Sequence, residues 1–220
     1  MPGPDPARER DGLCDDALRA GPRAPTLCEG WAVRDLLVHL AVRDGRPDVL
    51  AGEVLRRAVP ALGAHADRLQ GRWREEPFEA LVQRVRSGPP AVSPARWRPV
   101  AGLVNGVEFF VHREDVRRAQ EGWRPRELAR EESQGLWGAV RLAGRAAYRR
   151  SPVGVVLVTP DGPRSVVRGG PVSVSLRGEP QELLLHASGR RTRALVEVDG
   201  APHAVRAFTD AFPGTPAAPG

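Results

Sequence analysis

Glu108 and His112 are the pair whose residue types and spacing point most directly to chemistry. The surrounding sequence predicts a helix over residues 99–120 through an apolar stripe that consists of Leu103, Val107, Phe110 and Val111. A four-residue spacing stacks the two side chains on one helix face, with Cβ atoms about 5–6 Å apart. An imidazole nitrogen and a carboxylate oxygen so placed can both reach one metal ion, at roughly 2.0–2.2 Å each. A simple Glu–His hydrogen bond is the alternative that spacing alone leaves open.

His39 lies in a second apolar segment, residues 31–42, which predicts a helix with its leucines on one side. We expect the polar stretch 43–47 to break this helix. A lone histidine on an apolar face is more often a hydrogen-bonded core residue than a metal ligand. Inward polar residues on two helices of one bundle nevertheless favour a shared centre, because bundle metal sites are built from facing helices.

The rest of the chain changes character near residue 151. Before it, helical patterns are predicted at about 6–20, 59–73, 77–87 and 127–149, and Thr26 and Glu29 have the spacing of a helix capping box. After it, short β-branched runs and turn signals predict strands at 153–158, 165–168, 171–176 and 194–198, with helices at 179–188 and 201–211. We therefore expect an α+β two-domain protein: a four-helix-type bundle over residues 1–150, a small α+β domain over 151–212 and a flexible tail over 213–220.

The charge of the chain, +6 with a pI of about 10.8, raises the question of nucleic-acid binding. All 33 basic residues are arginine, and they are dispersed among carboxylates, as in the segment 72–76. A nucleic-acid surface more often shows a one-sided basic block interleaved with aromatic residues. The sequence therefore argues against a nucleic-acid partner.

Targeting and redox signals are sparse. No stretch approaches the roughly 20 apolar residues of a spanning helix, and the N-terminal residues lack the apolar core of a signal peptide. We expect a cytoplasmic protein with no membrane partner. Cys14 and Cys28, the two cysteines, are expected to be ordinary thiols, although a disulfide between them is possible.

Two segments resemble the metal-binding helices of a known family. The segment 27–40, which runs Leu-Cys-Glu-Gly-Trp-Ala-Val-Arg-Asp-Leu-Leu-Val-His-Leu, is similar to the first metal helix of DinB-like bundles. The segment 107–116, with its Glu-x-x-x-His pair, is similar to the second. Together they resemble the actinobacterial mycothiol-dependent maleylpyruvate isomerase family. The resemblance implies that His39, Glu108 and His112 are the three protein ligands of one metal ion. Residues 178–190 resemble that family's sterol-carrier-like C-terminal domain.

The activity implied by this resemblance is thiol chemistry at a metal centre. Three protein ligands leave one coordination position open, which is typical of a catalytic site with zinc or another first-row divalent metal. In the family this position takes the sulfur of mycothiol, a low-molecular-weight thiol, which attacks a small electrophilic substrate. The resemblance thus implies an isomerase or a thiol S-transferase. A hydrolase that uses metal-activated water and a non-catalytic metal- or small-molecule-binding protein are the alternatives. The sequence selects neither one electrophile nor an oligomeric state.

Contacts to a substrate or to the ligand shell are less clearly marked. Arginine side chains suit anionic groups, so arginines are the candidates for contacts to an anionic substrate. The candidates are Arg34, Arg113, Arg190, Arg193 and Arg206, and the last three are the candidate catalytic residues. Arg113 is expected to point about 100° away from His112. Glu114 and Asp115 are candidate acceptors for an imidazole N–H, with an ion pair between Asp115 and Arg118 as the alternative. The remaining histidines, which we expect not to be ligands, are His65, His186 and His203.

Overall fold

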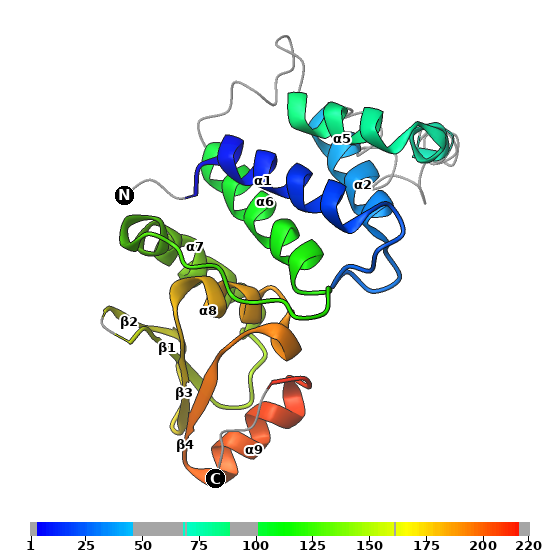
Figure 1. The fold of residues 1–220 in the computed structure, drawn as a ribbon. Coiled ribbons are helices and arrows are strands. Elements are labelled where there is room, and N and C mark those ends of the chain that lie inside the picture. Colours follow the sequence, from blue (N-terminus) through cyan, green and yellow to red (C-terminus); the bar gives the residue numbers. More distant parts are fainter. Residues whose placement is uncertain (1–3, 46–67, 69, 89–100, 161, 216–220) are drawn as a thin grey trace, which may run out of the picture. The chain divides into compact units, whose positions relative to one another are not determined.

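The computed structural model describes residues 4–45, 68, 70–88, 101–160 and 162–215, and these form two compact units. The first unit, Asp5–Pro125, is helical, and the second, from Arg126 onward, contains the β-sheet (Figure 1). The mixed α/β composition, with helices first and strands later, confirms the expected order of elements. No helix within the described ranges is both long enough and apolar enough to cross a membrane.

Four named helices build the first unit: α1 (Pro6–Ala20), α2 (Val33–Gly45), α5 (Phe78–Ser87) and α6 (Ala101–Arg117). Helix α1 packs along α6 and against α5, and α5 packs on α2 (Figure 1). Pro6 opens α1 at a position where its missing N–H costs nothing, and the Asp5 side chain accepts a hydrogen bond from the Ala7 N–H at 2.9 Å. Residues 70–75 are also helical. They overlap the end of the predicted range 59–73, whose first part lies outside the described residues, and extend two residues past it.

The core of this unit draws side chains from all four helices. Completely buried members include Leu13, Leu36, Leu40, Leu81 and Phe109. Burial of such apolar side chains is worth about 1.5–3 kcal/mol each before entropy costs. Because α2 and α6 both contribute to this core, it fixes the two helices that carry the candidate ligands.

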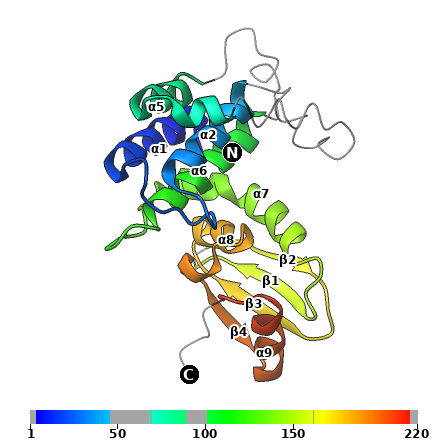
Figure 2. The same cartoon turned by 90° about the vertical axis from the view of Figure 1, so that its right-hand side faces the viewer.

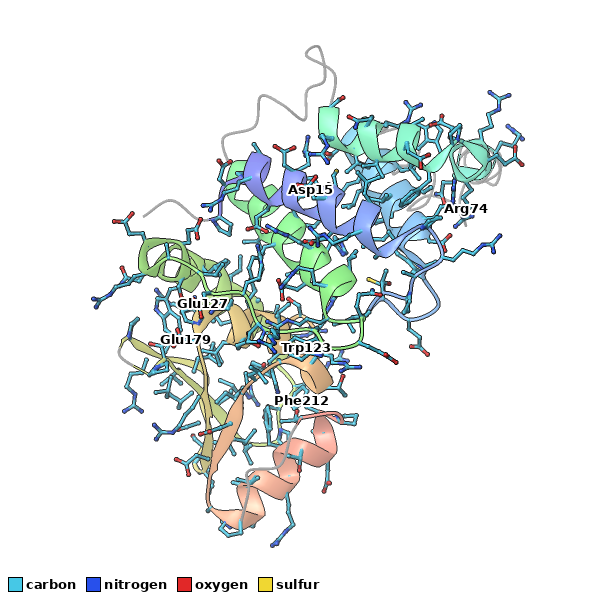
Figure 3. All side chains as sticks on the ribbon, viewed as in Figure 1. Asp15, Arg74, Trp123, Glu127, Glu179 and Phe212 are labelled. Atoms are coloured by element: carbon cyan, nitrogen blue, oxygen red, sulfur yellow. The ribbon has the colours of Figure 1, made fainter. Side chains whose placement is uncertain are left out.

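Ion pairs connect the outer faces of the helices. Asp15, which projects from α1 in Figure 3, accepts a hydrogen bond from Arg86 of α5 at 2.6 Å. Arg74, also labelled there, donates to Asp35 at 3.1 Å. Surface pairs of this kind contribute about 0–1 kcal/mol each. The apolar core, rather than the surface pairs, therefore sets the helix positions.

The second unit is a four-stranded sheet with helices packed on it (Figure 2). Its strands are β1 (Gly154–Val158), β2 (Arg164–Arg168), β3 (Ser173–Arg177) and β4 (Glu197–Gly200), and its helices are α7 (Arg130–Ala147), α8 (Pro180–Ala187) and α9 (Pro202–Ala211), with a short 3-10 turn at Arg191–Arg193. The strand order is β2-β1-β3-β4, with β1 and β3 parallel and the outer pairs antiparallel. The parallel central pair was not predicted.

A glycine permits this parallel pairing. Between β2 and β3 the chain passes the start of β1, where the Gly154 N–H donates to the Val172 carbonyl at 2.8 Å. A Cβ atom at Gly170 would lie only 2.6 Å from the Gly154 nitrogen. A larger residue at Gly170 would therefore force the crossing strand segment away from β1.

Two expectations about boundaries differ from the structure. Residues 126–150 were assigned to the bundle, but the compact units divide at residue 125/126, because α7 packs on α8 and on β2. The strand predicted at 194–198 begins later, at Glu197, and its first residues form the end of the turn that follows α8. Of the predicted flexible tail, residues 213–215 are described, and Thr215 contacts His186 at 3.2 Å; residues 216–220 lie outside the described ranges.

Candidate metal centre

His39, Glu108 and His112, the three predicted ligands, come together between α2 and α6. One ligand atom from each lies within 4.8 Å of the ligand atoms of the other two. The Nε2 atom of His112 is 3.9 Å from Oε1 of Glu108, and the rings of the two histidines are 5.9 Å apart at 72°. All three residues are half-buried. The structure therefore forms a compact cluster of two imidazoles and one carboxylate.

The start of α2 sets the direction of His39. The Ala32 N–H donates to the Asp35 carboxylate at 3.2 Å, which satisfies one of the free amides at the helix N-terminus. The ring of Trp31, just before the helix, lies 5.1 Å from the His39 ring at 53°. Buried Leu36 and Leu40 flank His39 and face the core. These contacts hold the imidazole on the side of α2 that faces α6.

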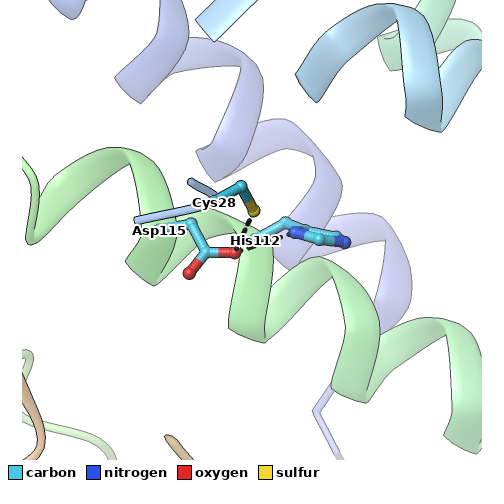
Figure 4. A group of neighbouring side chains, drawn as sticks. All are labelled: Cys28, His112 and Asp115. Carbon is cyan, nitrogen blue, oxygen red and sulfur yellow. Dashed lines mark hydrogen bonds and ion pairs between the residues drawn. The ribbon is translucent and has the colours of Figure 1, made fainter. Parts of the chain in front are cut away.

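Asp115 supports His112 from behind (Figure 4). Its carboxylate has no exposed surface, and Oδ2 lies 2.9 Å from Nδ1 of His112. The Cys28 thiol donates to the same oxygen at 3.3 Å. A carboxylate can only accept, so the imidazole proton lies on Nδ1 and the Nε2 lone pair is left for the cluster. The prediction that Asp115 accepts an imidazole N–H is confirmed by this geometry.

Cys28 reaches α6 because the loop that carries it is closed on itself. Thr26 Oγ1 donates to the Trp31 carbonyl at 2.8 Å and accepts from the Cys28 N–H at 3.2 Å. The Leu27 N–H then donates to the backbone carbonyl of Asp115 at 3.1 Å. The expected capping box at Thr26 is wrong, since α2 begins only at Val33 and Thr26 organises the preceding loop instead.

The cluster fits a divalent metal in donor chemistry and nearly in dimensions. Bonds of about 2.1 Å in a tetrahedral arrangement place ligand atoms about 3.4 Å apart. The separation of 3.9 Å between His112 and Glu108 and the limit of 4.8 Å for the whole set are slightly larger. Small side-chain rotations would close that difference. Two imidazoles and a carboxylate suit zinc and other first-row metals.

Arg43 is a member of this neighbourhood that the sequence did not indicate. The predicted helix break at 43–47 is wrong in its first part, because α2 continues through Arg43 to Gly45. One turn beyond His39, the Arg43 guanidinium forms an ion pair with Oε1 of Glu108 and lies over the Phe109 ring at 5.7 Å. The cluster thus already contains one positive charge.

A second group of potential ligands shares His112. Cys28, His112 and Asp115 also place ligand atoms within 4.8 Å of one another. In this group, however, both neighbours of Asp115 are joined to it by hydrogen bonds, and a metal would have to replace the proton on Nδ1 of His112. We therefore assign Cys28 and Asp115 to the hydrogen-bonded support of the first group.

Other charged residues of α6 have different partners. Arg118 bonds Glu114 at 2.5 Å, with both side chains buried. The alternative of an ion pair between Asp115 and Arg118, and the role of Glu114 as an acceptor for an imidazole N–H, stay predictions. Arg113 points to Asp16 of α1 at 2.8 Å, away from His112 as expected. The Arg34 side chain donates to two backbone carbonyls, at Arg74 and Glu76.

The remaining candidates belong to the second unit. Arg190 donates to the Ser188 carbonyl at 2.6 Å, and the side chains of Arg193 and Arg206 are exposed. Their suggested role in substrate binding stays a prediction. The other histidines expected not to be ligands are His186, which is fully buried beside Tyr148, His203, which is exposed, and His65, which lies outside the described residues.

A hollow of about 410 Å³ lies elsewhere on the first unit, lined by residues of α1, α6 and the following loop. Its walls include Asp16, Arg19, Arg117 and Trp123 and none of the cluster residues. Arg117 of α6 approaches Asp16 of α1 at 3.9 Å, so this hollow lies between α1 and α6.

Comparison with known proteins adds no relative. The chain matches no protein-family model, no curated protein and no solved structure. The fold and the site define this chain as a mixed α/β protein whose helical unit carries a His–Glu–His cluster.

Proposed function

We propose that this protein is a metal-dependent enzyme that uses a small thiol, of the maleylpyruvate isomerase or S-transferase kind. In this proposal the helical unit is a DinB-like bundle and the second unit is a sterol-carrier-like domain. The observation that carries it is the convergence of His39, Glu108 and His112, from two helices, on one point. Isolated Glu-x-x-x-His pairs arise by chance, but a third potential ligand from a second helix, with its ligand atom within 4.8 Å of both, is far less common.

The three cluster residues would hold the metal, with zinc as the first candidate and another first-row divalent ion as the second. A bound divalent metal would supply an open coordination position in which a thiol loses its proton more readily. Glu108 would balance part of the metal charge. Asp115 holds the ring of His112 through Nδ1 and leaves Nε2 free to face the metal, which is the usual role of a carboxylate behind a metal-binding histidine.

Both cysteine thiols already have partners within the protein, which favours a thiol nucleophile from outside the chain. Cys14 is completely buried, its thiol lies 3.7 Å from the Val82 carbonyl, and burial raises its pKa to about 11. Cys28 donates its hydrogen to Asp115. A thiol nucleophile at the cluster would therefore come from outside the chain, and mycothiol is the proposed cosubstrate.

The experiment that tests thiol use is cobalt substitution followed by addition of mycothiol. We expect a sulfur-to-cobalt charge-transfer band to appear, and maleylpyruvate turnover by the zinc protein to require the thiol. The Cys28→Ser variant is the control that removes the nearby protein sulfur and should give the same band. An unchanged cobalt spectrum would contradict thiol chemistry, and turnover without thiol would favour the hydrolase that uses metal-activated water.

A further inference from the structure

Arg43 and His39 are four residues apart on α2, so the helix that brings one imidazole to the cluster also brings a guanidinium. Arg43 pairs with Oε1 of Glu108, and this is the same oxygen that lies 3.9 Å from Nε2 of His112. The cation therefore lies against the ligand oxygen that faces the other ligands.

A second acceptor for Arg43 lies next to it. Nη2 of Arg43 is 3.9 Å from Oδ1 of Asp44, whose other oxygen accepts from Arg10 at 2.7 Å. Both guanidiniums lie over the Phe109 ring, with centroid distances of 5.7 Å for Arg43 and 4.4 Å for Arg10. The Asp44 carboxylate is buried, and desolvation raises its pKa above the usual range. A carboxylate in this position gains from any additional positive partner.

We propose that Arg43 is a built-in competitor for the metal: it neutralises Glu108 in the metal-free protein and moves toward Asp44 when a metal binds. The inference rests on the proposed function, whose metal site it concerns. A guanidinium and a divalent cation on one carboxylate oxygen would repel each other at a few ångströms, in a half-buried site where such repulsion is weakly screened. Exchange of one cation for the other avoids that repulsion and leaves Glu108 paired in both states.

The opposite reading gives Arg43 the role of an orienting partner. Ligating carboxylates are commonly held by a hydrogen-bond donor, and loss of such a donor weakens metal binding. That donor normally bonds the oxygen that does not face the metal. Arg43 instead pairs with Oε1, the oxygen that lies 3.9 Å from Nε2 of His112, which favours competition. The two readings predict changes of opposite sign in metal affinity.

The test compares the zinc affinity of the wild-type chain and of Arg43→Gln, by titration against a chromophoric chelator. Because the metal no longer has to displace a guanidinium from Glu108, Arg43→Gln should bind zinc roughly tenfold or more tightly than the wild type. Arg86→Gln is the control for charge, since Arg86 pairs with Asp15 at 2.6 Å on a different face of the unit. This control should bind zinc as the wild type does.

The outcomes separate the two proposals. Tighter binding by Arg43→Gln alone, or zinc binding by that variant where the wild type binds none, supports the competition. Equal or weaker binding by Arg43→Gln overturns it and leaves the metal site standing. If neither protein binds zinc, cobalt or nickel while both remain folded by circular dichroism, the metal centre and the competition are both wrong.

Discussion

The Nδ1 atom of His112 lies 2.9 Å from a carboxylate oxygen of Asp115, a residue with no exposed surface. They lie three positions apart on α6, so one helix supplies both the candidate ligand and the group that fixes its tautomer. Burial of this carboxylate without a partner would be costly, and the His112 and Cys28 donors offset that cost. The two hydrogen bonds that Asp115 accepts explain why this buried position carries a carboxylate, which packing alone does not explain.

Replacement of Asp115 by asparagine should weaken metal binding by about 10–100-fold. The amide keeps the size of the side chain but loses the negative charge that accepts from Nδ1 of His112. Chelator competition with zinc would measure the change. Asp199→Asn, which removes an exposed carboxylate paired with Arg177 at 3.3 Å, is the matched control and should leave the affinity unchanged. Equal affinities in all three proteins would show that Asp115 has no part in metal binding.

The two cysteines should differ sharply in reactivity. Cys14 has no exposed surface, and burial raises its pKa to about 11, so little thiolate is present at pH 8. Cys28 is partly exposed. We expect iodoacetamide to label Cys28 in the native protein and Cys14 only after unfolding, as read by peptide mass spectrometry. Labelling of Cys14 first would mean that α1 is not packed as described.

His186 should make the stability of the chain depend on pH. Tyr148 Oη lies 2.6 Å from its Nδ1, and burial, followed by the charge of Arg191, lowers its pKa from 6.5 to about 4. The folded state thus favours the neutral ring, while the unfolded chain binds a proton below pH 6.5. This contribution to stability is present above pH 6.5 and is lost as the pH falls toward 4.

Between pH 7 and pH 5 the loss from His186 amounts to about 2 kcal/mol in the free energy of unfolding. Urea unfolding at the two pH values measures it. His186→Gln should lose that part of the pH dependence, whereas the exposed His203→Gln should keep it. The same pH dependence in wild type and His186→Gln would refute the assignment.

Two leucines on α1 offer a matched test of the helical core. Leu13 is completely buried, whereas Leu18 is 43% exposed. Leu13→Ala should destabilise the chain by about 2–5 kcal/mol, and Leu18→Ala by less than about 1 kcal/mol. Thermal and urea unfolding of the two variants provide the comparison. Similar losses at both positions would mean that α1 is rotated from the described position.

The sequence predicted local features better than contacts between elements. Periodicity gave α1 and α6 because their apolar residues repeat along one helix face. His39, Glu108 and His112 were predicted as a set through residue spacing and family resemblance, and the structure brings them together. The tautomer of His112 could also be predicted from the sequence, because Asp115, three residues later, lies on the same helix face.

Arg43 and Cys28 could not be found in the same way. Arg43 begins a polar run that resembles a helix end, and only the continued helix places it against Glu108. Cys28 lies in a loop whose closure depends on the hydroxyl of Thr26 and on one backbone bond to Asp115. The unit boundary was misplaced because the amphipathic pattern of α7 does not specify whether its apolar face packs on helices or on α8 and β2.

The most direct test of the central claim, the metal centre at His39, Glu108 and His112, is to measure zinc content and zinc affinity. The wild type, purified without an affinity tag, is compared with His39→Ala and His112→Ala. We predict about one zinc per chain in the wild type and a loss of most of it in both variants, with His203→Ala unchanged. Elemental mass spectrometry gives the content, and circular dichroism shows whether each variant is folded. Full zinc occupancy in folded His39→Ala and His112→Ala, or no uptake of divalent metal by either the wild type or Arg43→Gln, would contradict the metal centre.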